Sequence, residues 1–237
     1  TDPRFYEWLW QMENEIRPLV PLVYYHVWDN HPLPFFNQKF YESTDHIACI
    51  SRVTKECVNG VAPSVSCNYI PHTVDPKVFV ALSDAARKDL RSKLLPPEDQ
   101  DKFILFWNNR NARRKQSGSV LWWFAEWVKE RNLSGKVQLI MHTNPKDGHG
   151  QDLQQIAARL ELNNREVMIS TKKLPTSQMP GFYNAADVTV NIADAEGFGL
   201  ATLESLTCGT PVIATVTGGL QDQLGITDDD GNPVEFN

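Results

Sequence analysis

Short apolar runs alternate with helical segments along most of this 237-residue chain. Continuous apolar runs are typical of strands buried on both faces of a parallel sheet, and helices between them are the usual crossovers. The alternation therefore predicts an α/β fold. We expect strands at residues 19–27, 46–51, 65–71, 102–108, 136–143, 165–170, 187–193 and 211–215. We expect helices at 3–17, 38–45, 52–60, 119–132, 150–162 and 200–208, and a shorter helical stretch at 177–186.

A charged segment over residues 75–100 interrupts this alternation and is closed by Pro96 and Pro97. Because three predicted strands precede it and five follow, we expect two Rossmann-like domains, each with a parallel sheet. The start without Met and the turn-like end predict that the chain is a piece of a longer protein, with the first domain only partly present. The predicted parts are the C-terminal portion of a first domain (1–80), a linker with a connecting helix (81–100) and a second domain (101–237).

Composition excludes several classes of protein. The formal net charge of −6 opposes general nucleic-acid binding, which needs a broad basic surface. The four cysteines form no CxxC pair and lie near no His cluster at zinc spacing, so we expect reduced thiols, a cytoplasmic location and no metal. The sequence has no signal peptide and no apolar run of the ~18 residues that a membrane span requires.

The segment EGFGLATLE, residues 196–204, combines a glycine turn with two glutamates eight positions apart. It follows a predicted strand and opens a predicted helix, where exposed N–H groups favour an anion. Gly197 and Gly199 would let backbone amides approach that anion closely. In a continuous helix Glu196 and Glu204 would lie ~12 Å apart, so they could bind two hydroxylated ends of one elongated ligand. The alternative is that Glu196 caps the helix and Glu204 is a surface acid.

A second candidate site is the basic loop that follows the predicted strand at 102–108. Arg110, Arg113, Arg114 and Lys115 cluster there, and such cations can neutralise a diphosphate. The alternative is a solvated run of charges. Since both loops follow strands of the same predicted sheet, we expect them to face one crevice.

These residues together resemble a known family. The stretch EGFGLATLESLTCGTPVIATVTGG is similar to the signature of retaining nucleotide-sugar glycosyltransferases of the GT-B fold, family 4. Glu196 and Glu204 match the family's E-x7-E motif, and Arg110 and Lys115 have its Arg-to-Lys spacing. SCNYIPHTVDPKVF and NAADVTVNIADAEGFG resemble further family segments, so the likeness covers most of residues 45–225.

The resemblance implies a role for each matching residue. Arg110 and Lys115 would hold the donor diphosphate and stabilise the leaving group. Glu204 would bind the ribose hydroxyls, and Glu196 would hold the transferred sugar. The supporting positions implied by the family are Gly197, Phe198 and Gly199 for the sugar, Leu200 and Ala201 for phosphate, and Lys173 and Leu174 for the base.

One family residue is harder to place. A histidine near the donor sugar follows a buried strand in the first domain, and His26 is the candidate, with Asp29 and His31 on the same loop as others. A structural histidine is the alternative reading of His26. Asn109 and Gln116 depart from the family pattern, which usually has glycine at both positions.

The resemblance implies metal-independent transfer, with retention, of a sugar from a UDP- or GDP-type donor to an unknown glycan, lipid or protein. No cofactor is implied, and peripheral membrane contact could come through sequence that precedes residue 1. The alternatives are a sugar-nucleotide epimerase or phosphorylase of the same fold and a non-catalytic sugar-nucleotide-binding subunit. A nicotinamide dehydrogenase is disfavoured because no strand is followed by GxGxxG.

Overall fold

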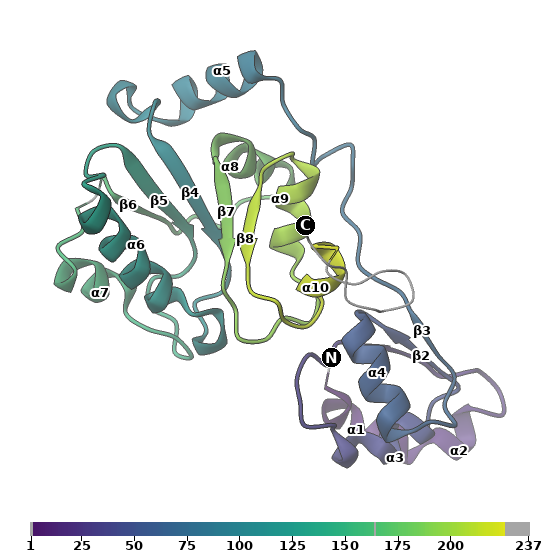
Figure 1. Ribbon diagram of the computed structural model, residues 1–237. Helices are drawn as coiled ribbons and strands as arrows, with labels where there is room; N and C mark the ends of the chain where they lie inside the picture. The colour runs from purple at the N-terminus through teal and green to yellow at the C-terminus, as the bar shows by residue number, and fades with distance from the viewer. Residues whose placement is uncertain (1, 164, 226–237) are drawn as a thin grey trace. The chain divides into compact units, whose positions relative to one another are not determined.

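The computed structural model describes residues 2–163 and 165–225 (Figure 1). They divide into two compact units. The first comprises the described residues up to Thr73, Ala195–Gly199 and the described residues from Val216 on, and the second comprises Val74–Asp194 and Leu200–Thr215. Each unit contains one parallel sheet, and all eight predicted strands occur.

The sheet of the first unit has the order β1-β2-β3. Its core includes Tyr41, Ile47 and Val58, and all three are buried. Ser51 begins α4 as expected, because its hydroxyl accepts a hydrogen bond from the backbone N–H of Thr54. The elements of this unit are η1 (Pro3–Tyr6), α1 (Glu7–Gln11), α2 (Glu13–Ile16), β1 (Val23–His26), η2 (Phe35–Asn37), α3 (Gln38–Glu42), β2 (His46–Cys49), α4 (Arg52–Val61), β3 (Cys67–Tyr69) and α10 (Leu220–Gln223).

The helix predicted over residues 3–17 is not continuous. It divides into η1, α1 and α2, and the backbone leaves the helical region at Met12, with φ −99° and ψ 7°. The indole N–H of Trp10 donates to the carbonyl oxygen of Pro3 at 2.8 Å and so fixes the first turn against α1. The apolar spacing that predicted one helix is therefore shared by three short ones.

The sheet of the second unit has the order β6-β5-β4-β7-β8, with every neighbouring pair parallel (Figure 1). The chain passes outward from β4 to β6 and then returns to the other side of β4, so the strand order reverses between β4 and β7. In open α/β sheets a ligand crevice forms at this reversal, outside the carboxyl ends of the strands. The strands are β4 (Phe103–Asn108), β5 (Val137–His142), β6 (Val167–Ser170), β7 (Val188–Asn191) and β8 (Val212–Ala214).

Helices bury both faces of this second sheet. Phe106 and Trp107, adjacent on β4, are both 0% exposed but belong to separate core clusters, since successive strand side chains point to opposite faces. Trp107 packs with residues of α6 and α7, and Phe106 packs with Tyr183 of α8. The helices are η3 (Pro97–Asp99), η4 (Arg113–Lys115), α5 (Asp84–Leu94), α6 (Ser117–Arg131), α7 (Leu153–Arg159), η5 (Thr176–Gln178), α8 (Pro180–Ala185) and α9 (Leu200–Thr207).

Residues 81–100 were predicted to form a linker with a connecting helix, and they contain α5 (Asp84–Leu94). By its contacts this segment belongs to the second unit. Arg87 and Arg91 of α5 both bind the carboxylate of Asp187, at 2.8 and 2.6 Å, just before β7. Ala195–Gly199, expected in the second domain, clusters with the first unit instead.

Candidate functional site

Two loops of the second unit meet at the reversal of strand order. One follows β4 and contains η4, and the other follows β7 and begins at Ile192. The backbone N–H of Asp194 donates to the carbonyl oxygen of Arg114 at 2.8 Å, and the Asp194 carboxylate accepts from Nε2 of Gln116 at 2.7 Å. The basic loop and the start of the β7 loop therefore lie together, as expected for loops that follow neighbouring strands.

Arg110 has a carboxylate partner that the sequence did not indicate. Its Nε lies 2.9 Å from Oδ2 of Asp147, and its Nη2 lies 3.1 Å from Oδ1. The Arg110 hydrogen bonds, helped by the backbone N–H of His149, lower the pKa of Asp147 to about 2. The Arg110 side chain is nevertheless 62% exposed, so solvent and ligands can reach it.

The remaining basic residues of the loop differ in exposure. Arg113 and Arg114 are exposed, whereas Lys115, at the end of η4, is only 7% exposed. The alternative of a solvated charge run therefore does not describe Lys115. A lysine is rarely buried without an interaction that offsets the cost of removing its charge from water.

Glu204, on α9, is linked by hydrogen bonds through Tyr183 to the carboxyl end of β4. The hydroxyl of Tyr183 donates to Oε2 of Glu204 at 2.5 Å and accepts from Nδ2 of Asn108 at 2.8 Å. Burial raises the pKa of Glu204, and the Tyr183 hydrogen bond offsets part of that rise. Glu204 is thus not a solvated surface acid, and Arg110 follows Asn108 by only two residues. The sequence reading missed both Tyr183 and Asn108.

The other strands of this sheet also end in polar residues. Nδ1 of His142, at the end of β5, lies 3.0 Å from Oγ of Ser170, at the end of β6. Burial lowers the pKa of His142. Lys173 is exposed and Leu174 is half-buried in the loop that follows β6. At the start of α9, Leu200 is exposed and Ala201 is half-buried.

In the first unit, the turn from Glu196 to Gly199 is held by its own neighbours. The backbone N–H of Gly219 donates to the carbonyl oxygen of Glu196 at 2.9 Å, and Nε2 of Gln223 donates to that of Phe198. Gly199 has φ +88°, a conformation that favours glycine. Glu196 itself is 8% exposed.

The same turn lies beside the end of β1. A Cβ at Gly197 would come within 3.1 Å of the carbonyl oxygen of Val27, so the absence of a side chain permits this approach. The Phe198 ring packs edge-on against His72, with 5.3 Å between ring centroids. Asp222, on α10, accepts a hydrogen bond from the backbone N–H of Arg52 at 2.9 Å at the start of α4.

His26 lies in the interior of the first unit. It is 0% exposed, and its Nε2 lies 2.5 Å from the hydroxyl of Tyr41. His26 is therefore buried as a structural histidine would be, and its role near a donor sugar stays a prediction. Asp29 is half-buried and His31 is exposed on the loop that follows β1.

The predicted site residues are thus distributed over both units. His26 and the turn from Glu196 to Gly199 belong to the first unit. The second unit brings the loop of Arg110 and Lys115 to the strand end that anchors Glu204. The distance between the two glutamates stays a prediction, since the division between units falls at Gly199.

No group of three or more His, Cys, Asp or Glu residues that could hold a metal ion occurs in the described part of the chain. Within residues 2–163 and 165–225, no helix is long and apolar enough to cross a membrane. The four cysteines are not joined in disulfides.

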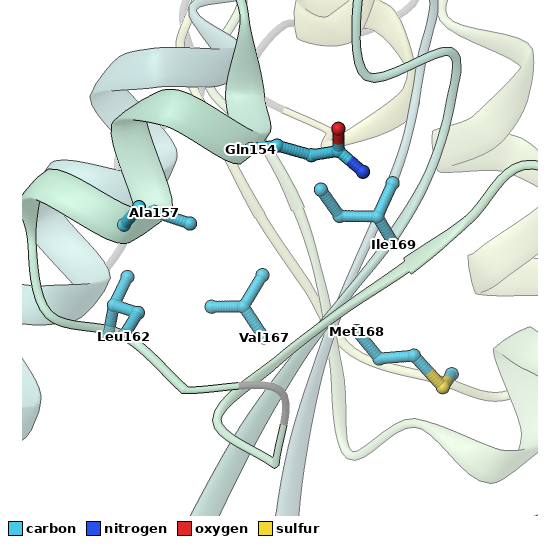
Figure 2. A pocket seen from close by; sticks show the side chains of 7 residues that line it. Gln154, Ala157, Leu162, Val167, Met168 and Ile169 are labelled. Atoms are coloured by element: carbon cyan, nitrogen blue, oxygen red, sulfur yellow. The ribbon is translucent and has the colours of Figure 1, made fainter.

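A pocket of about 440 Å³ lies between α7 and the edge strand β6 (Figure 2). Figure 2 shows Ala157, Leu162, Val167 and Ile169 around it, with Gln154 at its margin. Its lining is mostly apolar and includes none of the residues that the sequence predicted for the site. We therefore place the candidate site at the β4 and β7 loops.

Comparison with known proteins provides independent information. Residues 148–232 match the family model described as glycosyl transferases group 1. The alpha-monoglucosyldiacylglycerol synthase of Streptococcus pneumoniae is 31% identical over 178 residues, which are 74% of this chain and 38% of that protein. The D-inositol 3-phosphate glycosyltransferase of Corynebacterium jeikeium is 31% identical over 164 residues, 67% of this chain and 38% of that protein. The chain thus spans less than half the length of these relatives.

Solved structures establish the fold. Sucrose-phosphate synthase from Thermosynechococcus elongatus has a TM-score of 0.70 at 21% identity, covering 90% of this chain and 55% of that one. The α,α-trehalose 6-phosphate synthase from Burkholderia multivorans has a TM-score of 0.74 at 14% identity, with coverages of 92% and 57%. Anabaena HepE, solved in complex with UDP-glucose, has a TM-score of 0.66 at 19% identity, with coverages of 88% and 56%. The expected GT-B fold is confirmed.

Proposed function

We propose that this chain, which belongs to the group 1 glycosyl transferases, binds a nucleotide diphosphate sugar and contributes the donor side of a sugar-transfer reaction. The observation that carries the proposal is the gathering of cations and a carboxylate at the end of one strand. Arg110 and Lys115 follow β4, and Asn108 at its end is linked through Tyr183 to Glu204. The cations can neutralise the diphosphate of the donor, and the carboxylate can accept hydrogen bonds from the ribose hydroxyls.

The cations would act most strongly in the transition state. As the bond between the sugar and the diphosphate breaks, negative charge develops on the departing phosphate, and preorganised cations there lower the barrier. Lys115 is suited to this task because water screens a buried charge less than an exposed one. The backbone N–H groups of Leu200 and Ala201, at the start of α9, would add donors to phosphate. In this proposal no divalent metal and no cofactor is needed.

The carboxylates would orient the donor. Glu204 accepts one hydrogen bond from Tyr183, and a carboxylate has lone pairs for further hydroxyls, here those of the ribose. Glu196 and the amides of Gly197 to Gly199 would hold the transferred sugar. Lys173 and Leu174 would contact the base. We further propose that the sugar is transferred with retention of configuration, as the resemblance implies.

The names of the relatives bear on the base of the donor and on the class of acceptor. Anabaena HepE is described in complexes with UDP and UDP-glucose, which supports a UDP-type donor, with GDP as the second base to test. The relatives are named for a glucosyldiacylglycerol and for inositol 3-phosphate, so acceptors differ within the family. Glycan, lipid and protein acceptors all remain within the proposal.

The test measures binding of UDP and GDP to the full chain by isothermal titration calorimetry. We expect Arg110→Ala and Glu204→Gln each to weaken binding by about 10-fold or more, because each removes a charged hydrogen bond to the ligand. Arg131→Ala, at the exposed last residue of α6, is the matched control and should leave affinity unchanged. Undiminished affinity in both site variants would refute the assignment.

A further inference from the structure

Asp147, the carboxylate partner of Arg110, is in the loop that follows β5 and was not among the predicted site residues. We propose that Asp147 is a positioning residue, which holds the guanidinium of Arg110 in the orientation that receives the donor diphosphate. This inference rests on the proposed function, because it assigns a purpose to an ion pair with one of the proposed phosphate ligands.

The geometry of the ion pair leaves Arg110 able to bind an anion. Asp147 takes the side of the guanidinium formed by Nε and Nη2, at 2.9 and 3.1 Å. An arginine has five N–H donors in a rigid planar fork, so the Nη1 side and the outer hydrogen of Nη2 lie outside this pair. A carboxylate that blocked phosphate binding would be expected to take the end of the fork, between Nη1 and Nη2. The observed contact is the one that orients Arg110 without occupying that end.

Asp147 is itself fixed by the backbone. Its Oδ1 accepts the N–H of His149 at 2.9 Å, and its carbonyl oxygen accepts the N–H of Gly150 at 3.0 Å. The Asp147 side chain is 14% exposed, compared with 62% for Arg110. The carboxylate is therefore the anchored partner, and the long arginine side chain is the one that is oriented.

The loop that carries Asp147 is joined to the basic loop by several further hydrogen bonds. The N–H of Arg113 donates to the carbonyl oxygen of His149 at 3.0 Å, and Nδ2 of Asn111 donates to that of Gln151 at 2.6 Å. A Cβ at Gly150 would overlap the carbonyl oxygen of Asn111, so the two loops touch at backbone level. Asp147 thus has a defined position relative to the segment that contains both Arg110 and Lys115.

The ion pair between Asp147 and Arg110 should strengthen binding of the donor diphosphate more than it weakens it. An exposed arginine loses rotamer freedom when it binds a ligand, and a partner that orders it beforehand removes part of that loss. The Asp147 charge also repels a nearby phosphate, which is the opposing effect. Because this charge is already paired with the Arg110 guanidinium, whose side chain is 62% exposed to screening solvent, we expect orientation to dominate.

A double-mutant cycle tests the inference, with UDP and GDP as the probes and the full chain as the protein. The four proteins are the wild type, Asp147→Asn, Arg110→Ala and the double variant, measured by calorimetry. Asp147→Asn retains an oxygen that can accept the His149 N–H, but it loses the negative charge of the ion pair with Arg110. We expect it to weaken nucleotide binding about 3- to 10-fold in the wild type and less than about 2-fold when Arg110 is alanine.

Two further variants separate positioning from a structural role. Asp89→Asn removes an exposed carboxylate from an ion pair with Lys93 on α5, and it should not change affinity. Asp147→Glu keeps the charge and should recover part of the affinity that Asp147→Asn loses. A merely structural role would lower the unfolding midpoint without producing dependence on Arg110.

The outcomes are distinct. Equal losses from Asp147→Asn with and without Arg110, or tighter binding in Asp147→Asn, would overturn the inference while the proposed function stands. The second result would show that Asp147 competes with the ligand for Arg110. A wild-type chain that binds neither UDP nor GDP would overturn the proposed function, and the inference with it.

Discussion

Tyr183 provides the sharpest test of the network around Glu204. Tyr183→Phe removes one hydroxyl and leaves the ring, which packs against Phe106 and Phe79 in the core, so little apolar contact is lost. Two partly buried hydrogen bonds are lost, one to Oε2 of Glu204 and one from Nδ2 of Asn108. A hydrogen bond to a charged group contributes about 1.5–3 kcal/mol, and a neutral one about 1 kcal/mol. We expect the free energy of unfolding to fall by about 2.5–4 kcal/mol.

The loss should depend on pH. Burial already raises the pKa of Glu204 above its unfolded value, so the ionised carboxylate is destabilising in the folded state. The Tyr183 hydrogen bond lowers this pKa, and its removal therefore raises it further. A carboxyl with a raised pKa weakens stability as pH increases through the interval between the unfolded and folded values. Tyr183→Phe should accordingly cost more at pH 7 than at pH 4.5.

Urea denaturation followed by circular dichroism at the two pH values measures this difference. Tyr6→Phe, at a tyrosine that is 39% exposed, is the control and should change stability by less than about 0.5 kcal/mol. A loss below about 0.5 kcal/mol in Tyr183→Phe, or an equal loss at both pH values, would refute the reasoning about Glu204.

Two other predictions concern the backbone contact at Gly150 and the role of metal ions in the reaction. Gly150→Ala should lower the free energy of unfolding by about 2 kcal/mol or more, because the new Cβ overlaps the carbonyl oxygen of Asn111, whereas Gly148→Ala, with open space around it, should be near neutral in thermal melts. Nucleotide release from a UDP- or GDP-sugar donor, by a protein that contains this chain, should be unchanged by EDTA; a loss of release that added Mg²⁺ restores would contradict the proposed role of Arg110 and Lys115.

The strands could be predicted from the sequence because each buried strand is a short local run of apolar residues. β4 is buried on both faces, and its run FILFWN carries that signal without help from any other segment. The division into units could not be predicted in this way. Residues 195–199 come only three residues after β7, yet Gly197 and Phe198 pack near Val27 and His72, and no local pattern records such contacts.

The candidate site was predictable in part for the same reason. Glu196, Glu204, Arg110 and Lys115 stand in short motifs with fixed spacing. Asp147 and Tyr183 were missed because their partners lie far along the chain, 37 positions away for Arg110 and 75 for Asn108. The Asp-Gly pair at 147–148 signalled only a turn.

The helix α10 was not predicted from the sequence. It has four residues, which is too short to produce a helical period.

The most direct test of the central claim is a crystal structure of this chain with UDP bound. The account predicts the diphosphate within hydrogen-bond distance of the Arg110 guanidinium and the Lys115 ammonium, with the ribose hydroxyls on the Glu204 carboxylate. A nucleotide bound elsewhere, for example in the pocket between α7 and β6, with no contact to these three residues, would contradict it.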